Sequence, residues 1–225
     1  MHVHIWYKML KNTIEPNTMK SASGFFLVLV IFSFSVLANS SVVSNADNIR
    51  PLLTGQFVAN AKLKTSFGGD IKLLSLIEKK PSVILFYRGG WCPYCSRQMA
   101  GLVEVEQRII DLGYQIIAIS PDSPERLTAQ RSNQEFNLIH LSDSALEATL
   151  AFGLGYYVED EIVDIIRGQL GAELVSIEGE TKVVLPVPAA YIVDTTGLVK
   201  FAYVNPNYQQ RINPQLLYQA ARLSR

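Results

Sequence analysis

The residues best suited to chemistry in this sequence are two cysteines, Cys92 and Cys95, separated by Pro93 and Tyr94. They are the only cysteines among the 225 residues. Two thiols at this spacing can close into a small disulfide ring and reopen as a dithiol. The pair therefore predicts thiol redox chemistry.

The elements around the pair place it at a strand-to-helix junction. Residues 82–87 form an apolar run typical of a buried strand, residues 88–90 a turn, and residues 96–112 an amphipathic helix. Cys92 then lies at the helix N-terminus, where unpaired N–H groups and the helix dipole stabilise a thiolate and lower its pKa. We expect Cys92 to be the nucleophile and Cys95, one turn inside the helix, to be its resolving partner.

Other uses of a Cys-X-X-Cys pair are less well supported. A zinc site needs two more ligands, and only His2, His4 and His140 remain as histidines, so no metal site is predicted. Haem attachment requires histidine directly after the second cysteine, where Ser96 stands. A purely structural disulfide stays open as an alternative, although so short a loop restricts the unfolded chain little.

Composition limits the class of partner. The chain has 20 basic and 20 acidic residues and no basic cluster, which argues against a nucleic-acid partner. Residues 49–225 are enough for one domain with a full core. No cofactor is predicted.

The N-terminal residues predict export. Residues 1–38 are interpreted as an extension followed by a signal peptide that starts near Met19, with an apolar run over 24–38 and cleavage after Ala38. An uncleaved membrane anchor is the alternative. Residues 39–48 form a Ser- and Asn-rich linker. The mature protein would enter an oxidising compartment, most simply a bacterial periplasm.

The remaining pattern predicts an α/β domain. Strands over 83–87 and 115–120 flank the redox helix as a parallel βαβ unit. Further expected elements are a weak strand within 56–67, a turn at 68–70, helices over 73–78, 124–133, 142–153 and 158–170, a strand at 138–141, a hairpin of 189–193 with 198–204, and a C-terminal helix that Asn213 and Pro214 start. The pattern of residues 173–184 fits either a ribbon or an irregular insert.

Three segments together carry a family resemblance: Phe86–Cys95 (FYRGGWCPYC), Pro51–Gly55 (PLLTG) and Tyr191–Gly197 (YIVDTTG). They resemble the peroxiredoxin-like branch of the AhpC/TSA (alkyl hydroperoxide reductase and thiol-specific antioxidant) family. This resemblance implies a thioredoxin-like fold, a central mixed sheet flanked by helices, and a peroxidatic role for Cys92. It also implies a peroxide or a disulfide-containing protein as substrate, and an external thiol as reductant.

Two positions depart from the family pattern. Gly89 stands where typical members have a threonine, and Pro188 stands where they have an arginine. In typical members, that threonine and that arginine hold the peroxide. Val187-Pro188 instead resembles the cis-proline of thioredoxin-like proteins, which would let Pro188 contact an extended substrate; an ordinary trans proline is the alternative. On these grounds we expect disulfide exchange to exceed peroxide reduction.

Residues near the pair suggest further roles. Arg88 could stabilise the Cys92 thiolate or a peroxide oxygen, or could simply be solvated. Trp91 could shield the disulfide and bind substrate, or pack in the core. Tyr208 and Arg211 follow the last expected strand without an assignable role. The alternative to an enzyme is a redox-inactive binding module, or a copper metallochaperone that uses both cysteines and His140.

Overall fold

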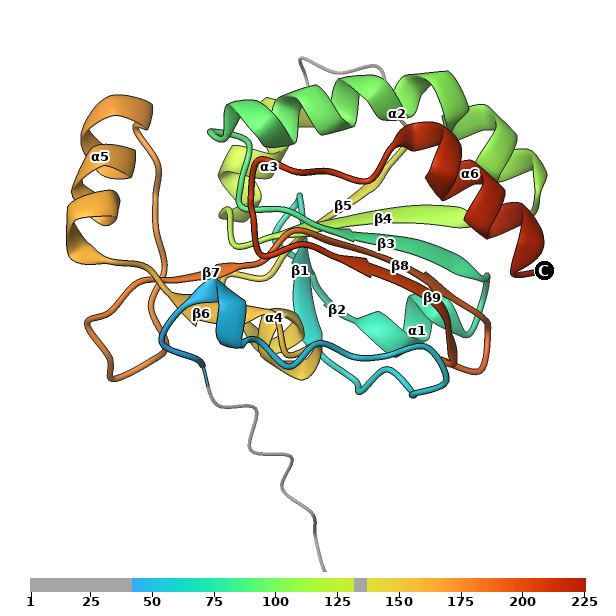
Figure 1. Ribbon diagram of the computed structural model, residues 1–225, viewed down its shortest axis with the longest axis horizontal. Helices are drawn as coiled ribbons and strands as arrows, with labels where there is room; N and C mark the ends of the chain where they lie inside the picture. Colours follow the sequence, from blue (N-terminus) through green and yellow to red (C-terminus); the bar gives the residue numbers. More distant parts are fainter. Residues whose placement is uncertain (1–41, 132–136) are drawn as a thin grey trace, which may run out of the picture. The chain divides into compact units, whose positions relative to one another are not determined.

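The computed structural model describes residues 42–131 and 137–225. Its centre is a mixed sheet of seven strands in the order β2-β1-β5-β4-β3-β8-β9 (Figure 1). Strands β3, β4 and β5 are mutually parallel, whereas β1, β8 and β9 each pair antiparallel with a neighbour. The strands are β1 (Lys62–Thr65), β2 (Asp70–Lys72), β3 (Ser82–Phe86), β4 (Gln115–Ser120), β5 (Ile139–Ser142), β8 (Ala189–Val193) and β9 (Val199–Val204).

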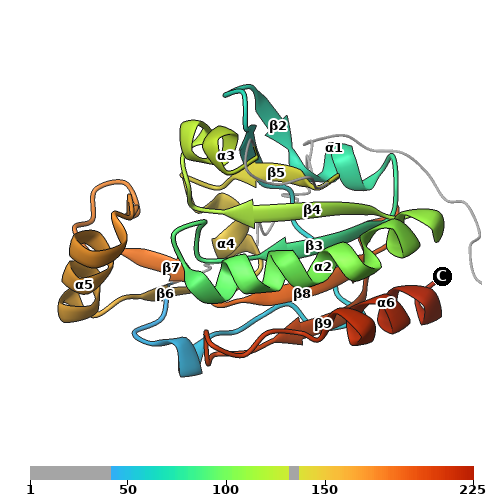
Figure 2. The ribbon, with the colours of Figure 1, turned by 90° about the horizontal axis from the view of Figure 1, so that it is seen from above.

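Helices cover both faces of this sheet. Helices α2 (Pro93–Asp111) and α6 (Pro214–Leu223) pack on one face, and Figure 2 shows α2 running over β3. Helices α1 (Leu73–Ile77) and α4 (Glu147–Ala151) pack on the other, while α3 (Pro124–Arg131) contacts β5. Because side chains of a strand alternate, Val83 and Leu85 join the core under α2, and Ile84 and Phe86 join the opposite core.

A smaller unit projects beside the cysteine end of the sheet. It consists of the antiparallel pair β6 (Gly155–Tyr157) and β7 (Val184–Pro186) and of helix α5 (Asp160–Leu170), at the left of Figure 1. Val163 and Ile166 of α5 bury their side chains in a third apolar cluster with Val183 and Leu185. Trp91 packs against this cluster and also against the core under α2. The unit is therefore joined to the redox loop through an aromatic side chain.

The predicted α/β, thioredoxin-like fold class is confirmed, with some differences in the elements. The strand expected within 56–67 begins only at Lys62, and Asp70, expected in a turn, begins the strand β2. The segment 173–184 is irregular except for an isolated bridge between Ser176 and Val183, and its last residue begins β7. Short polar stretches of this kind pair only because the folded sheet offers them an edge.

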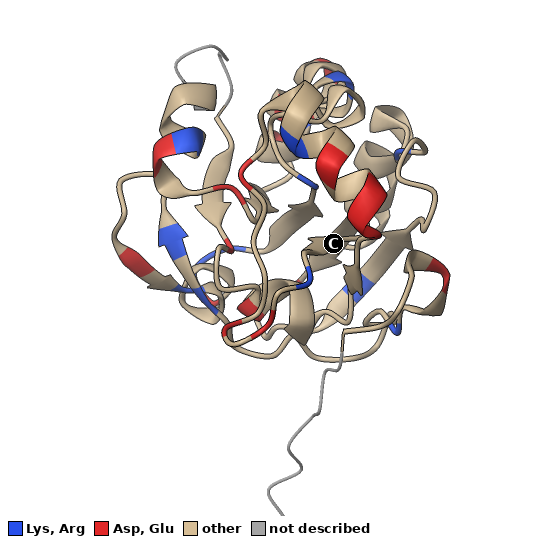
Figure 3. Cartoon of the chain, turned by 90° about the vertical axis from the view of Figure 1, so that its left-hand side faces the viewer, with Lys and Arg blue, Asp and Glu red and all other residues tan. Residues whose placement is uncertain are grey.

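The N-terminal predictions fall largely outside the described residues. The signal or anchor segment within 1–38 lies there entirely. Part of the predicted linker 39–48 does not run free, because Val43 forms a bridge with Tyr156 and residues 46–48 form a 3-10 turn. In the described ranges, no helix combines the length and apolar character needed to span a membrane. Acidic and basic residues are interspersed on the face drawn in Figure 3, as the balanced composition predicts.

Candidate functional site

Cys92 and Cys95 lie where the sequence predicts them, at the junction of β3 and α2. Cys92 is the N-cap of α2, and its carbonyl oxygen accepts hydrogen bonds from the N–H groups of Cys95 at 2.9 Å and Ser96 at 3.1 Å. Pro93 at the first helical position lacks an N–H, which costs nothing there because that group has no helical acceptor. Both cysteines are reduced and each is 1% exposed. The strand-to-helix junction therefore fixes the spacing and orientation of the pair.

The two thiols differ strongly in acidity. The pKa of Cys92 is lowered to about 6, chiefly by a hydrogen bond from the Cys95 thiol; the Cys95 N–H and the charges of Arg88 and Arg211 add to this, and burial opposes it. The pKa of Cys95 is raised, because its thiol donates to Cys92 and because it is buried. At neutral pH, Cys92 is thus mainly a thiolate and Cys95 a thiol, so Cys92 is the cysteine that is ready to attack first.

Arg88 is not solvated but buried beside Cys92. It is 4% exposed, and its guanidinium carbon lies 5.1 Å from the centre of the Trp91 ring and 4.3 Å from that of Tyr208. Its Nε atom is buried and makes no hydrogen bond. A buried guanidinium normally has a carboxylate partner, but none is within salt-bridge distance among the described residues. Arg88 therefore holds an unused donor and a positive charge next to the thiolate.

A second arginine reaches the pair from the C-terminal part of the chain. Arg211 donates from Nη2 to the sulfur of Cys95 at 3.4 Å, and from Nη1 to the carbonyl oxygens of Tyr208 and Gln210. Tyr208 covers Arg88 and meets Tyr94 edge to face at a centroid distance of 5.6 Å. The sequence assigns no role to Tyr208 or Arg211, since only the fold brings them to a motif more than a hundred residues away.

The loop before Trp91 is packed closely around its two glycines, and its backbone conformation requires glycine at position 89. Gly89 has a φ of +143°, and a Cβ there would overlap the Trp91 indole nitrogen and lie 2.8 Å from Oδ1 of Asp122. A Cβ on Gly90 would overlap the amide of Gln130. The threonine that typical AhpC/TSA members carry at the position of Gly89 would not fit here. The departure at Gly89 is thus a consequence of how this loop is packed.

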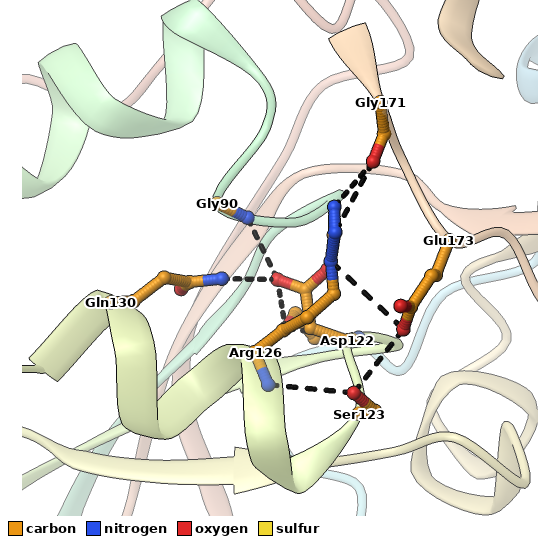
Figure 4. A network of polar contacts seen from close by, with 8 residues as sticks. Gly90, Asp122, Ser123, Arg126, Gln130, Gly171 and Glu173 are labelled. Atoms are coloured by element: carbon orange, nitrogen blue, oxygen red, sulfur yellow. Dashed lines mark hydrogen bonds and ion pairs between the residues drawn. The ribbon is translucent and has the colours of Figure 1, made fainter.

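Asp122 anchors the loop that precedes Cys92. The sequence pattern does not predict this contact. Its Oδ2 accepts hydrogen bonds from the Gly90 N–H at 2.7 Å and from the Gln130 side chain at 2.7 Å (Figure 4). Burial raises the pKa of this carboxyl. In the same view, Arg126 of α3 donates to the Gly171 carbonyl oxygen at the end of α5, and lies 4.0 Å from Glu173. These contacts hold the redox loop, α3 and the α5 unit together.

The expectation of a cis-proline is wrong. The Val187–Pro188 peptide is trans, and Pro188 is buried between β7 and β8. Hydrogen bonds fix this segment as extended backbone, from the Val187 N–H to the Leu154 carbonyl at 2.9 Å and from the Asn205 N–H to the Pro188 carbonyl at 3.2 Å. Pro188 is not among the residues that line the cavity beside Cys92. The structure therefore provides no support for a substrate contact at Pro188.

A cavity of about 560 Å³ gives access to Cys92. Arg88, Trp91 and Tyr208 line it near the cysteine, and residues of α5 form much of the rest. Its volume lies within the range of small-molecule sites. The predicted residues Cys92, Arg88 and Trp91 therefore meet at one cavity, and Cys95 lies behind them.

A metal site finds no ligand set in the parts of the chain that are described. No group of three or more His, Cys, Asp or Glu side chains there could hold an ion. His140 is buried in β5, where it pairs with Ala118 of β4. Cys92, Cys95 and His140 therefore do not form the metal site that the copper-carrier alternative requires.

Comparison with known proteins agrees with this geometry. The "Putative peroxiredoxin bcp" of Haemophilus influenzae is 32% identical over 81 residues, which are 36% of this chain and 52% of that protein, so the match spans about half the length of this curated relative. Peroxidoxin BcpB of Mycobacterium tuberculosis superposes with a TM-score of 0.59 at 17% identity, covering 76% of this chain and 97% of that one. Reduced Prx3 of Vibrio vulnificus in complex with hydrogen peroxide gives a TM-score of 0.60 at 19% identity, covering 76% and 99%.

These solved structures share the fold. The family model itself matches residues 54–202, a stretch that contains the cysteine pair, Arg88 and the whole sheet except the last two residues of β9. Because this match extends over more than half of the chain, the protein belongs to the AhpC/TSA family.

Proposed function

We propose that the protein is a thiol-dependent peroxidase in which Cys92 reduces a hydroperoxide and Cys95 resolves the product. The observation that carries this proposal is the buried Arg88 guanidinium beside a Cys92 thiolate, with no carboxylate partner among the described residues. Membership of the AhpC/TSA family supports the same reaction class. So does the likeness in fold to a Vibrio vulnificus protein solved in complex with hydrogen peroxide.

The reaction proceeds in three steps. The Cys92 thiolate attacks the distal oxygen of the hydroperoxide, the O–O bond breaks, and the alkoxide or hydroxide leaves with a proton as an alcohol or water. Cys92 is then a sulfenic acid. The Cys95 thiol loses its proton and its sulfur attacks the Cys92 sulfur, the hydroxyl group leaves with a proton as water, and the Cys92–Cys95 disulfide forms. Two equivalents of an external thiol, or one dithiol, reduce the disulfide and complete the cycle.

Arg88 takes over the task of the two residues that this chain lacks. The typical threonine and arginine of the family hold the peroxide and stabilise the charge that develops as the O–O bond breaks, and Gly89 and Pro188 cannot do so. Arg88 lines the same cavity as Cys92, and its Nε atom makes no hydrogen bond. A preorganised cation in a site shielded from water can supply this stabilisation. For this reason we rank peroxide reduction above disulfide exchange, the reverse of the ranking from the sequence.

Disulfide exchange is the second candidate, because an acidic Cys92 followed by Cys95 can also attack a substrate disulfide. The test mixes the reduced protein with a hydroperoxide or with a protein disulfide and follows oxidation of Cys92 by rapid alkylation. We expect faster oxidation by the hydroperoxide. Faster oxidation by the protein disulfide would reverse the ranking. Slow alkylation of the metal-free reduced protein at pH 7 would contradict both candidates and favour a redox-inactive binding module.

We also propose that the protein is exported with a signal peptide cleaved after Ala38, and that it acts in the periplasm. The support is the sequence pattern of residues 19–38, which lie outside the described part of the chain. N-terminal sequencing of the protein purified from the producing cells should find Asn39 first. Residues upstream of Gly24 in the purified protein would contradict cleavage and favour a membrane anchor.

A further inference from the structure

Arg211 brings a positive charge into direct contact with Cys95. Its Nη2 atom donates a hydrogen bond to the Cys95 sulfur at 3.4 Å. Among the described residues, no carboxylate lies within salt-bridge distance of Arg211, and its Nε atom is buried without a hydrogen bond. The charge therefore acts on Cys95 without a competing acidic partner. The first step of the proposed reaction uses only Cys92 and gives this contact no task.

The backbone around Arg211 holds the guanidinium in place. Its Nη1 atom donates to the carbonyl oxygens of Tyr208 and Gln210. The next residue, Ile212, is buried in the core under α2, and Asn213 after it is the N-cap of α6. A charge held in this way needs little rearrangement when a negative charge develops beside it. The segment is therefore preorganised to stabilise a thiolate at Cys95.

The acidity of Cys95 depends on the state of Cys92. In the reduced protein, the hydrogen bond to Cys92, burial and the negative charge of Cys92 raise the pKa of Cys95, whereas the charge and the hydrogen bond of Arg211 lower it. When Cys92 becomes a sulfenic acid its negative charge is lost, but Arg211 keeps its own charge. Tyr87, which also interacts electrostatically with Cys95, stays neutral because burial raises its pKa. Oxidation of Cys92 therefore shifts the balance towards the Cys95 thiolate.

We propose that Arg211 is a catalytic residue of the second half of the cycle, in which it stabilises negative charge on the Cys95 sulfur. For the resolving step, this inference rests on the proposed peroxidase function. In that step the Cys95 thiol loses its proton, its sulfur attacks the Cys92 sulfur, and the hydroxyl group of the sulfenic acid leaves with a proton as water.

Arg211 acts again when the disulfide is reduced. An external thiolate attacks the Cys92 sulfur, which the cavity makes accessible, and Cys95 leaves as a thiolate beside Arg211. A second external thiol then releases Cys92, and the two external thiols end as a disulfide. In both steps the negative charge lies on the Cys95 sulfur, at the atom that Arg211 contacts.

The two arginines of the site then act at different steps. Arg88 lines the cavity together with Cys92, whereas neither Arg211 nor Cys95 is among the residues that line it. Arg211 is also the weakest of the groups that lower the pKa of Cys92. Removing the charge of Arg211 should therefore affect the reaction with hydroperoxide little and disulfide formation strongly.

The test separates the two steps in a single turnover. Reduced protein is mixed with an equimolar amount of hydrogen peroxide without any other thiol, quenched in acid at intervals and analysed by mass spectrometry. The sulfenic acid gains an oxygen atom, and the disulfide loses the two thiol hydrogens. The variant Arg211→Gln removes the charge and keeps N–H donors for the backbone carbonyls.

The matched control is Arg108→Met. Arg108 also joins α2 to the C-terminal part of the chain, because it donates to Gln215 at 3.0 Å and lies 3.7 Å from the centre of the Tyr218 ring. It lies several helical turns beyond Cys95 in the same helix. If Arg211 served only to attach the C-terminal segment to α2, the two variants should behave alike.

In Arg211→Gln the sulfenic acid should form within about threefold of the native rate, and the disulfide at least tenfold more slowly, the lower range for loss of a preorganised charge. The sulfenic acid should therefore accumulate. A near-native first step also shows that the active-site loop of the variant is folded. Arg108→Met should match the native protein. Unchanged disulfide formation in Arg211→Gln, an equal slowing of both of its steps, or an equal loss in Arg108→Met would overturn the proposal.

The pH dependence of disulfide formation is a readout that a merely structural contact would not move. The rate should increase with pH as Cys95 ionises. Without the cation the pKa of Cys95 rises, so this increase should occur at higher pH in Arg211→Gln. Arg211→Lys keeps the charge and should return the increase towards the native pH. The same pH dependence in all three proteins would contradict the role of the charge.

Reduction of a preformed disulfide separates this proposal from the peroxidase function, because it needs no hydroperoxide. Dithiothreitol should reduce the Cys92–Cys95 disulfide more slowly in Arg211→Gln than in the native protein and in Arg108→Met. A native protein that forms no sulfenic acid would contradict the peroxidase, while slower reduction in Arg211→Gln would still uphold the role of Arg211. A native protein that forms the sulfenic acid, with equal rates of reduction in all three proteins, would uphold the peroxidase and overturn the role of Arg211.

Discussion

Replacing Cys92 with serine is expected to reduce hydroperoxide consumption to the rate of the reaction without protein. A serine hydroxyl is not ionised near pH 7, and the environment that lowers the pKa of the cysteine to about 6 cannot make it a comparable nucleophile. Cys95→Ser should still carry out the first step, which needs only Cys92, and then turn over slowly, because its sulfenic acid must wait for direct attack by the external thiol. The measurement is hydroperoxide loss per protein molecule in the presence of a dithiol.

The state of the sulfur distinguishes the two variants. Cys95→Ser should accumulate a sulfenic acid at Cys92, which a dimedone adduct detects by mass spectrometry. The matching serine substitution at Cys92 should give no adduct. An adduct at Cys95 in the Cys92→Ser protein, formed as fast as in the native protein, would show that the roles of nucleophile and resolving residue are reversed.

Replacing Arg88 with methionine is expected to slow the reaction of Cys92 with hydroperoxide about 100-fold, the typical cost of losing one preorganised donor in an active site. Methionine retains much of the apolar stem between Trp91 and Tyr208 but removes the charge. The pKa of Cys92 should also rise above its native value of about 6, because Arg88 is one of the charges that lower it. At pH 6, the thiolate fraction should therefore fall relative to the native protein.

Measuring the rate constant from pH 5 to pH 9 separates these two effects. In the native protein the rate constant should increase with pH through about 6 and then level off, since only the thiolate reacts. In Arg88→Met the increase should occur at higher pH, and the plateau should stay low. Arg97→Met is the matched control, because Arg97 stacks on Tyr94 in the first turns of α2 without lining the cavity of Cys92. An unchanged plateau in Arg88→Met would contradict the role of Arg88 in stabilising the departing oxygen.

Arg88→Lys addresses the geometry of this role. Lysine keeps the positive charge but offers a compact ammonium instead of a planar fork that can stack between two rings. It should restore part of the shift in the pKa of Cys92 and less of the plateau rate. Circular dichroism of both variants establishes whether the fold is retained.

The sequence by itself determined the framework of the site. An apolar run of β-branched residues, two glycines and an amphipathic pattern placed Cys92 at a strand-to-helix junction, and the structure has β3 and α2 there. Asn213 and Pro214 predicted the start of α6, where the Asn213 side chain accepts from the N–H groups of Gln215 and Leu216. These predictions succeed because strand alternation, helix periodicity and capping depend on neighbouring residues.

The tertiary structure alone decided the surroundings of Cys92. Arg88 could be solvated on sequence grounds, but it is buried, with Trp91 on the same loop and Tyr208 from a segment beyond β9 packed on its guanidinium. Arg211 reaches Cys95 through the same segment, and Asp122 reaches Gly90 from the end of β4. The trans form of Val187–Pro188 follows from pairing with Leu154 and Asn205 on either side. Contacts between residues so distant along the chain depend on how the whole sheet assembles, which local sequence patterns do not specify.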